Sequence, residues 1–155
     1  MRNRLGQLKN VISYDSIFKF MPLMIALALY ASGAYAQEIS GQITSPSNGD
    51  QVPPRYEVAG TISNLPSGYH LWVAVRRGNL LYPKEPESFV AGTNWDTTIS
   101  EGGKGRYRLV LLVVDSKGHR DIKDWLRVGN ETSHFPGKES IPGCKAIHAI
   151  SVIAR

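Results

Sequence analysis

The chain has 155 residues, enough for one domain of ordinary size, with 42% hydrophobic residues, 20% charged residues and a formal net charge of +5. Residues 1–36 hold four of the 18 basic residues and one of the 13 acidic residues, so the remainder carries a net charge of +2. The basic character is therefore no evidence for nucleic-acid binding, and we expect no nucleic-acid partner. The single cysteine, Cys144, excludes an intrachain disulfide.

The first 36 residues have the features of a secretory signal peptide. Four basic residues precede a short apolar run at 21–30, and the small-x-small sequence Ala34-Tyr35-Ala36 follows it. The run of about 10 residues is shorter than the roughly 20 that span a bilayer. We predict a signal peptide over 1–36, one domain over 37–155, and a periplasmic or secreted protein with no membrane span after signal removal. The alternative is an uncleaved membrane anchor.

Five segments of the predicted domain have the pattern of β-strands. Residues alternate between apolar and polar, with β-branched side chains, and clusters of Gly, Pro and Asn separate the segments, which are 55–62, 70–76, 95–99, 107–114 and 146–153. The fourth segment becomes apolar on both faces, which is typical of a central strand covered on both sides. The pattern predicts an all-β antiparallel sandwich.

One segment has helical rather than strand periodicity. Ile122, Trp125 and Leu126 recur at the spacing of a helix, and Gly129-Asn130 is a stop signal. We predict a short amphipathic helix over 116–129, before the last strand, which caps an edge or an end of the sandwich with Trp125 as its buried anchor. Residues 132–143, rich in Pro and Gly, are predicted to form the loop that returns to the final strand.

An ordered set of short motifs runs through residues 37–155. It comprises Ile43-Thr44-Ser45-Pro46, Val58-Ala59-Gly60-Thr61, His70-Leu71-Trp72-Val73, Tyr82-Pro83, Trp95 and Trp125-Leu126. This order resembles bacterial immunoglobulin-like β-sandwich domains of exported and multidomain proteins. The resemblance implies an immunoglobulin-like antiparallel β-sandwich that serves as an interaction module, and it supplies no catalytic or binding residues. The Cys–Trp–Cys arrangement of antibody domains is absent.

The sequence contains no recognisable metal motif. The four histidines, at 70, 119, 134 and 148, form no His-x-x-x-His pair, and the nearest combination is Cys144 with His148. That spacing suits a metal pair on a helix, but Pro142-Gly143 and the alternation after them predict a turn and a strand. We therefore expect no metal and no cofactor. A lone cysteine of this kind is expected to be buried and inert rather than paired with another chain.

Catalytic motifs are also missing from the sequence. There is no Gly-x-Ser-x-Gly elbow, and the glycine-rich segment 102–105 leads into a strand, which favours a turn over a phosphate loop. Glu85 and Glu87 flank Pro86, and we interpret them as loop carboxylates in solvent rather than a catalytic pair. The sequence predicts a protein that is not an enzyme.

The candidates for contact with a ligand lie in and near the stretch 67–83. Its alternation places Leu71, Val73 and Val75 on one buried face, and Trp72 is expected in the core. The remaining ligand-facing candidates are Arg76, Arg77, Tyr82 and Trp95, residue types that binding faces favour. The competing interpretation of the two arginines is a solvated strand end.

These patterns lead to one functional hypothesis and three alternatives. The hypothesis is an exported, non-enzymatic binding or interaction module of the cell envelope, with an envelope protein or a polysaccharide as its partner. A carbohydrate-binding module would need two or three coplanar exposed aromatic rings. A small envelope hydrolase would need a nucleophile hydrogen-bonded to a base. A structural or assembly subunit would need a long unpaired edge strand or a large exposed apolar patch.

Overall fold

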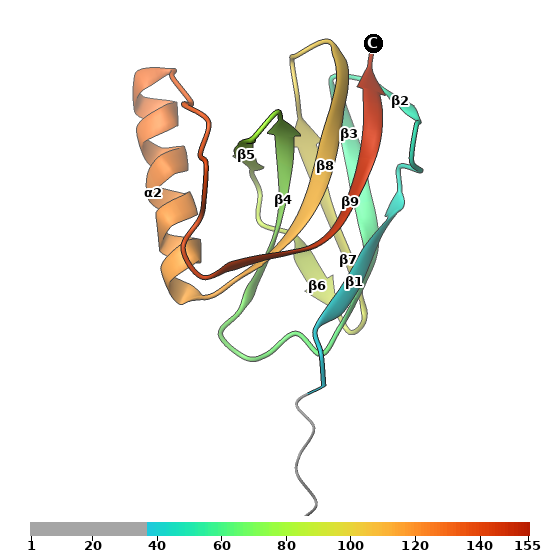
Figure 1. The fold of residues 1–155 in the computed structure, drawn as a ribbon, viewed down its shortest axis with the longest axis vertical. Coiled ribbons are helices and arrows are strands. Elements are labelled where there is room, and N and C mark those ends of the chain that lie inside the picture. Colours follow the sequence, from blue (N-terminus) through green and yellow to red (C-terminus); the bar gives the residue numbers. More distant parts are fainter. Residues whose placement is uncertain (1–36) are drawn as a thin grey trace, which may run out of the picture. The chain divides into compact units, whose positions relative to one another are not determined.

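Two β-sheets pack face to face in the computed structural model, which describes residues 37–155 (Figure 1). The described residues form one unit, an all-β sandwich with a single helix before the last strand. The predicted signal peptide, 1–36, lies outside the described residues. Within the described part of the chain, no helix is long and apolar enough to cross a membrane.

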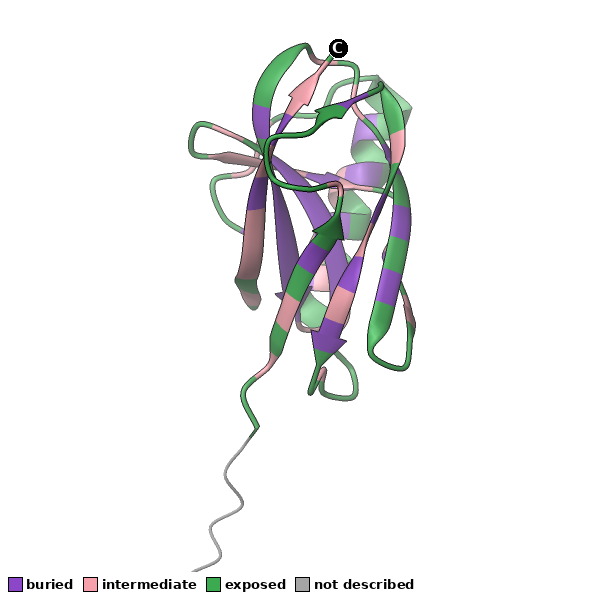
Figure 2. Cartoon of the chain, turned by 90° about the vertical axis from the view of Figure 1, so that its right-hand side faces the viewer, coloured by how far each residue is buried: buried purple, intermediate pink, exposed green. Residues whose placement is uncertain are grey.

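The first sheet has four antiparallel strands. Their spatial order is β1 (Ser40–Ser45), β3 (Arg55–Ser63), β7 (Asn94–Ser100) and β6 (Phe89–Ala91). Buried and exposed residues alternate along β7 without interruption, and Figure 2 shows the same alternation along the strands. One face of this sheet therefore meets the core while the other meets solvent, as the period-two pattern predicts.

The second sheet has five strands and carries the longest of them. Their order is β2 (Gln51–Val52), β9 (Cys144–Ala154), β8 (Gly105–Val114), β4 (His70–Arg77) and β5 (Leu80–Lys84). All neighbours are antiparallel except β2 and β9. β8 lies in the centre, and its last six residues are all buried. The prediction of a central strand covered on both sides is confirmed.

The main core lies between the two sheets. It receives alternate residues of β4 and β8, and the opposite sheet contributes a matching set, so that the core includes Leu71, Val73, Val75, Leu109, Leu111, Val113, Val58, Ile62, Trp95 and Ile99. Burial of these side chains is the dominant favourable term in folding. The expected burial of Leu71, Val73 and Val75 on one face is confirmed.

The single described helix is α2 (Ser116–Thr132). Asp115 caps its N-terminus, because its side chain accepts hydrogen bonds from the backbone N–H groups of Lys117 and Gly118. The helix passes through the predicted stop at Gly129, which is buried beneath the Phe135 ring, where a Cβ atom would collide. The left-handed residue that ends α2 is Ser133, with φ 56°, so the predicted end was four residues short of this cap.

Helix α2 covers the outer face of the five-stranded sheet rather than an edge or an end of the sandwich (Figure 1). Ile122 and Leu126 pack on the outward residues of β4 and β8, which are Trp72, Ala74, Val110, Leu112 and Val114. The expected position was wrong because these outward residues are themselves apolar and need a cover. Trp125 is half-buried and donates its indole N–H to the Pro136 carbonyl at 2.9 Å, so Ile122 is the buried anchor.

Replacement of Ile122 by alanine should release part of this second core. Ile122 has no solvent exposure, so Ile122→Ala should lower the free energy of unfolding by about 2–5 kcal/mol. The control is Val128→Ala on the exposed side of the same helix, where a change within about 0.5 kcal/mol is expected. Urea denaturation followed by circular dichroism measures both. Equal effects of the two substitutions would contradict the docking of α2 described above.

Candidate functional site

The four ligand-facing candidates from the sequence do not share one surface. Arg76 is exposed on the outer face of β4, whereas Arg77 points to the opposite face and is half-buried. Tyr82 is half-buried against the main core. Trp95 is 2% exposed. The turn Gly78-Asn79 joins β4 to β5 in an antiparallel hairpin.

Trp95 is a core residue, and the expectation that it faces a ligand is wrong. It pairs with Gly60 of β3, and the missing side chain of that glycine leaves space for the indole ring. The indole N–H donates to the Thr61 carbonyl at 3.0 Å, which satisfies the one polar group of the buried ring. Because Trp72 is also fully buried, an exposed platform of Trp72, Tyr82 and Trp95 is not present.

Arg77 is held by neighbours within the domain. Its Nη2 atom lies 3.4 Å from Glu101 Oε1, and its guanidinium lies over the Tyr107 ring at 5.0 Å from the centroid. Lys84 Nζ lies 2.8 Å from the other oxygen of Glu101. Burial alone would raise the pKa of Glu101, but the hydrogen bonds from Lys84 and the Gly103 amide, with the charge of Arg77, together lower it.

Arg76 belongs instead to a row of residues across the outer face of the five-stranded sheet. It pairs with Arg108 of β8, and Arg108 pairs in turn with Ser151 of β9. Arg106, two residues before Arg108, lies on the same face. All three arginines are exposed. We call Arg76, Arg106 and Arg108 the arginine surface.

The charges of the arginine surface have no carboxylate partner among the described residues. No ion pair involves these three side chains, and Arg76 donates to the Gly78 carbonyl instead. Like charges directly opposite each other on neighbouring strands are destabilising. The three arginines also line a cavity of about 550 Å³, with Arg77, Gly78, Tyr107 and Ser151. This end of the sheet is therefore an uncompensated cationic recess.

A second cluster lies at the other end of β4. His70 is the first residue of β4, Glu87 lies in the loop between β5 and β6, and His119 lies in the first turns of α2. His70 Nδ1 and Glu87 Oε1 are 2.7 Å apart, and His119 Nδ1 is 3.7 Å from Glu87 Oε2. We call His70, Glu87 and His119 the histidine cluster. Glu87 lies in a loop as expected, but its carboxylate is paired with His70 rather than surrounded by solvent.

The two imidazole rings of the histidine cluster stack on each other. Their centroids are 3.7 Å apart and their planes differ by 19°. Trp72 donates its indole N–H to His119 Nδ1 at 3.3 Å. Burial, and next the neighbouring His70, lower the pKa of His119, which favours the neutral form of its ring. The cluster thus combines two imidazoles, one carboxylate and a buried donor.

Sequence reasoning missed the histidine cluster because its members match no spaced motif. They come from three elements that meet only in the fold. One signal was available: His70 alternates onto the face of Trp72, and His119 lies near the start of the helix that covers that face. The pair that the sequence did suggest, Cys144 with His148, is separated by an irregularity in the pairing of β8 with β9.

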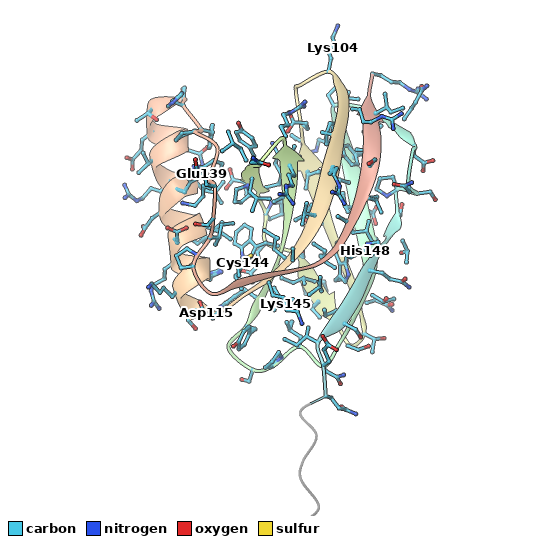
Figure 3. All side chains as sticks on the ribbon, in the orientation of Figure 1. Lys104, Asp115, Glu139, Cys144, Lys145 and His148 are labelled. Carbon is cyan, nitrogen blue, oxygen red and sulfur yellow. The ribbon has the colours of Figure 1, made fainter. Side chains whose placement is uncertain are left out.

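Cys144 and His148 point to opposite sides of their sheet. Cys144 packs on the helix side, whereas His148 Nδ1 accepts from the Ile43 backbone N–H of the other sheet at 3.1 Å. In Figure 3, Cys144 lies on the side of β9 toward α2 and His148 lies toward β1. Burial raises the pKa of the Cys144 thiol to about 11, so the thiolate is scarce at neutral pH.

Comparison with known proteins identifies no family for this chain. No family model and no curated protein matches the chain. Among solved structures, an engineered protein aligns with 76% of this chain at 13% identity and a TM-score of 0.45, and the endo-β-1,4-mannanase from Thermotoga petrophila aligns with 83% at 14% identity and a TM-score of 0.45. This chain spans 20% and 22% of those two chains. Neither likeness indicates a function for this chain.

Replacement of Glu101 should change how stability depends on pH. Because the folded pKa of Glu101 lies below its usual 4.5, its contribution is fully present above about pH 5 and is lost as the pH falls through the folded pKa. Wild type should therefore exceed Glu101→Gln in unfolding free energy at pH 6, and the difference should shrink toward about pH 3. Urea denaturation at several pH values measures this. Glu57→Gln, at an exposed site on β3, is the control, and a constant Glu101 difference across the series would contradict the assignment.

Cys144 should react slowly with thiol reagents in the folded protein. A thiol with a pKa of about 11 is almost fully protonated at neutral pH, and the thiolate is the nucleophile. The reaction with an aromatic disulfide reagent, followed by absorbance, should be much slower for folded than for guanidinium-unfolded protein. Equal rates in the two states would show an accessible, ionised thiol instead.

Proposed function

We propose that the domain is a non-enzymatic binding module of the cell envelope that holds an anionic polymer against the arginine surface. The observation that carries this proposal is the pair Arg76 and Arg108, directly opposite each other with no carboxylate partner in the described chain. A localisation in the periplasm or outside the cell is part of the proposal, because it rests on the predicted signal peptide.

The electrostatic repulsion between Arg76 and Arg108 is the first observation that supports an anionic partner. Two cations directly opposite each other on neighbouring strands weaken a sheet relative to neutral residues at the same positions. A bound anion would offset that repulsion. Guanidinium groups present planar forks that match phosphate and carboxylate oxygens, so arginine suits such a partner better than lysine does.

The spacing of the charges supports a polymer as the partner. Arg76 and Arg108 lie on neighbouring strands, roughly 5 Å apart at the backbone, and Arg106 and Arg108 are separated by roughly 7 Å along one strand. Charges repeated at such intervals suit a chain that carries a phosphate or carboxylate on successive units. The recess of about 550 Å³ beside them is large enough for part of such a unit.

The other functional hypotheses have less support. In the described residues, neither His70 nor His119 is hydrogen-bonded to a hydroxyl or a thiol, which a hydrolase of the nucleophile–base type would need. Of the four edge strands, β2 and β6 have only two and three residues, β5 contains Pro83, and β1 has six residues. The first three edges discourage strand addition, so an assembly subunit would have to rely on β1.

Removal of two charges from the arginine surface should weaken polyanion binding. Binding of the domain to poly(glycerol phosphate), polygalacturonate and neutral dextran is measured by surface plasmon resonance at two salt concentrations. Wild type should bind one or both charged polymers, more weakly at high salt, and should not bind dextran. Arg76→Gln with Arg108→Gln should lower the affinity by about tenfold or more, because two charge-assisted contacts are lost.

The matched control removes the same net charge elsewhere. Arg55 and Arg127 are exposed residues of β3 and α2 that lie outside the arginine surface, so Arg55→Gln with Arg127→Gln should leave most of the affinity. Equal loss in the two double variants would show a response to net charge alone. Tight binding to an acidic envelope protein, with none to either charged polymer, would replace the polymer with a protein partner.

A further inference from the structure

We propose that His70, Glu87 and His119 bind a divalent transition-metal ion of the zinc type, with one coordination position left for an external ligand. Nothing in the argument for polyanion binding requires this second site. The ligand atoms of the three residues all lie within 4.8 Å of one another. They come from β4, the β5–β6 loop and α2, so the fold brings them together.

The donor set selects the type of ion. Two imidazoles and one glutamate form the ligand set of several catalytic zinc sites, in which a water or a substrate takes the fourth position. Imidazole nitrogen suits zinc, copper and nickel, whereas magnesium and calcium prefer oxygen ligands. A tetrahedral ion about 2.0–2.1 Å from each ligand holds the ligand atoms roughly 3.3 Å apart. The Glu87 contacts of 2.7 and 3.7 Å lie on either side of that separation.

The backbone holds the three ligand-bearing segments in place. Ser88 follows Glu87, and its N–H donates to the carbonyl of Leu71, the neighbour of His70, at 3.0 Å. Val114, which pairs with His70 across the sheet, precedes the Asp115 cap of α2. His70 is thereby tied closely to Glu87, through a hydrogen bond between the residue next to each, and more loosely to His119, which lies five residues after Val114. Such prior positioning lowers the entropy lost when an ion binds.

The surroundings leave the cluster accessible. The side chains of His70, Glu87 and His119 are 29%, 33% and 20% exposed. His70 and Glu87 also line a recess of about 440 Å³, whose rim includes the exposed rings of Tyr69 and Phe89. The buried Ser88 hydroxyl in the same recess has no hydrogen-bond partner in the described chain. A ligand or water on the fourth position would enter this recess.

Two features of the site work against the ion and make the proposal testable. Lys123 and Arg120 of α2 lie near His119 and repel a cation. The three side chains are also already hydrogen-bonded without an ion, because His70 donates to Glu87 and Trp72 donates to His119. A bound ion must replace the His70 proton, rearrange the Trp72 contact and turn the two stacked rings, because the lone pair of each ring nitrogen lies in its ring plane. Trp72 fluorescence should therefore change when a metal binds.

The experiment measures metal binding directly in untagged protein. Isothermal titration with Zn²⁺, and with Mg²⁺ for comparison, gives affinity and stoichiometry, and Co²⁺ reports coordination geometry through its visible absorption. We expect one Zn²⁺ per chain, a tetrahedral Co²⁺ spectrum, quenched tryptophan fluorescence with Cu²⁺ and a higher Tm with Zn²⁺. Binding of Mg²⁺ as tight as that of Zn²⁺ would overturn the proposal.

Variants locate the ion. Glu87→Gln and His119→Gln keep the size and hydrogen-bonding capacity of each site, and each should weaken Zn²⁺ binding by at least about tenfold, since even supporting partners of metal ligands contribute about 10- to 100-fold. His134→Gln, at an exposed loop histidine, should leave the affinity unchanged. Wild-type affinity in Glu87→Gln and His119→Gln, or loss of binding in His134→Gln, would overturn the assignment. Circular dichroism shows whether each variant is folded. If Glu87→Gln or His119→Gln is unfolded, His70→Gln is used in its place.

Discussion

The central constraint on this fold is that β4 and β8 are apolar on both faces. Their inward residues form the core between the sheets, and their outward residues, such as Trp72 and Leu112, form a second apolar surface. Exposure of that second surface would leave large aromatic and aliphatic side chains in water, at a cost of about 1.5–3 kcal/mol for each. Helix α2 removes it from water. A plain two-layer sandwich is thus extended by a third layer over one sheet.

This third layer places the two candidate sites at opposite ends of β4. Where α2 begins, it brings His119 onto His70. At the far end, the outward residues change from Ala74 to Arg76, and on β8 from Val110 to Arg108. At this end the outward side chains are charged and can stay in water, so they do not need to be covered by α2. One strand therefore explains both why histidines gather at its start and why unpaired arginines lie at its end.

The sequence predicts the strands well because their signal is local. Period-two alternation identified the core strands, and the two-sided apolar pattern placed β8 in the centre. The errors concern what meets in space. The expectation that Trp95 faces a ligand fails because its burial depends on Gly60, which lies on another strand. The pairing of Glu87 could not be predicted because its partners, His70 and His119, lie 17 and 32 positions away in the sequence. Such contacts leave no periodic trace in the sequence.

The separation of the two sites bears on how they could act together. His70 and Arg76 are six residues apart on an extended strand, which corresponds to about 20 Å. That distance exceeds the Debye length of about 8 Å at physiological salt, so a charge gained at the histidine cluster would affect an anion at the arginine surface only weakly. Coupling would have to pass through α2, whose first turns carry His119 and whose later turns pack on the sheet. Rigid packing of Ile122 and Leu126 opposes such a movement. The geometry therefore favours two sites that bind independently on one scaffold.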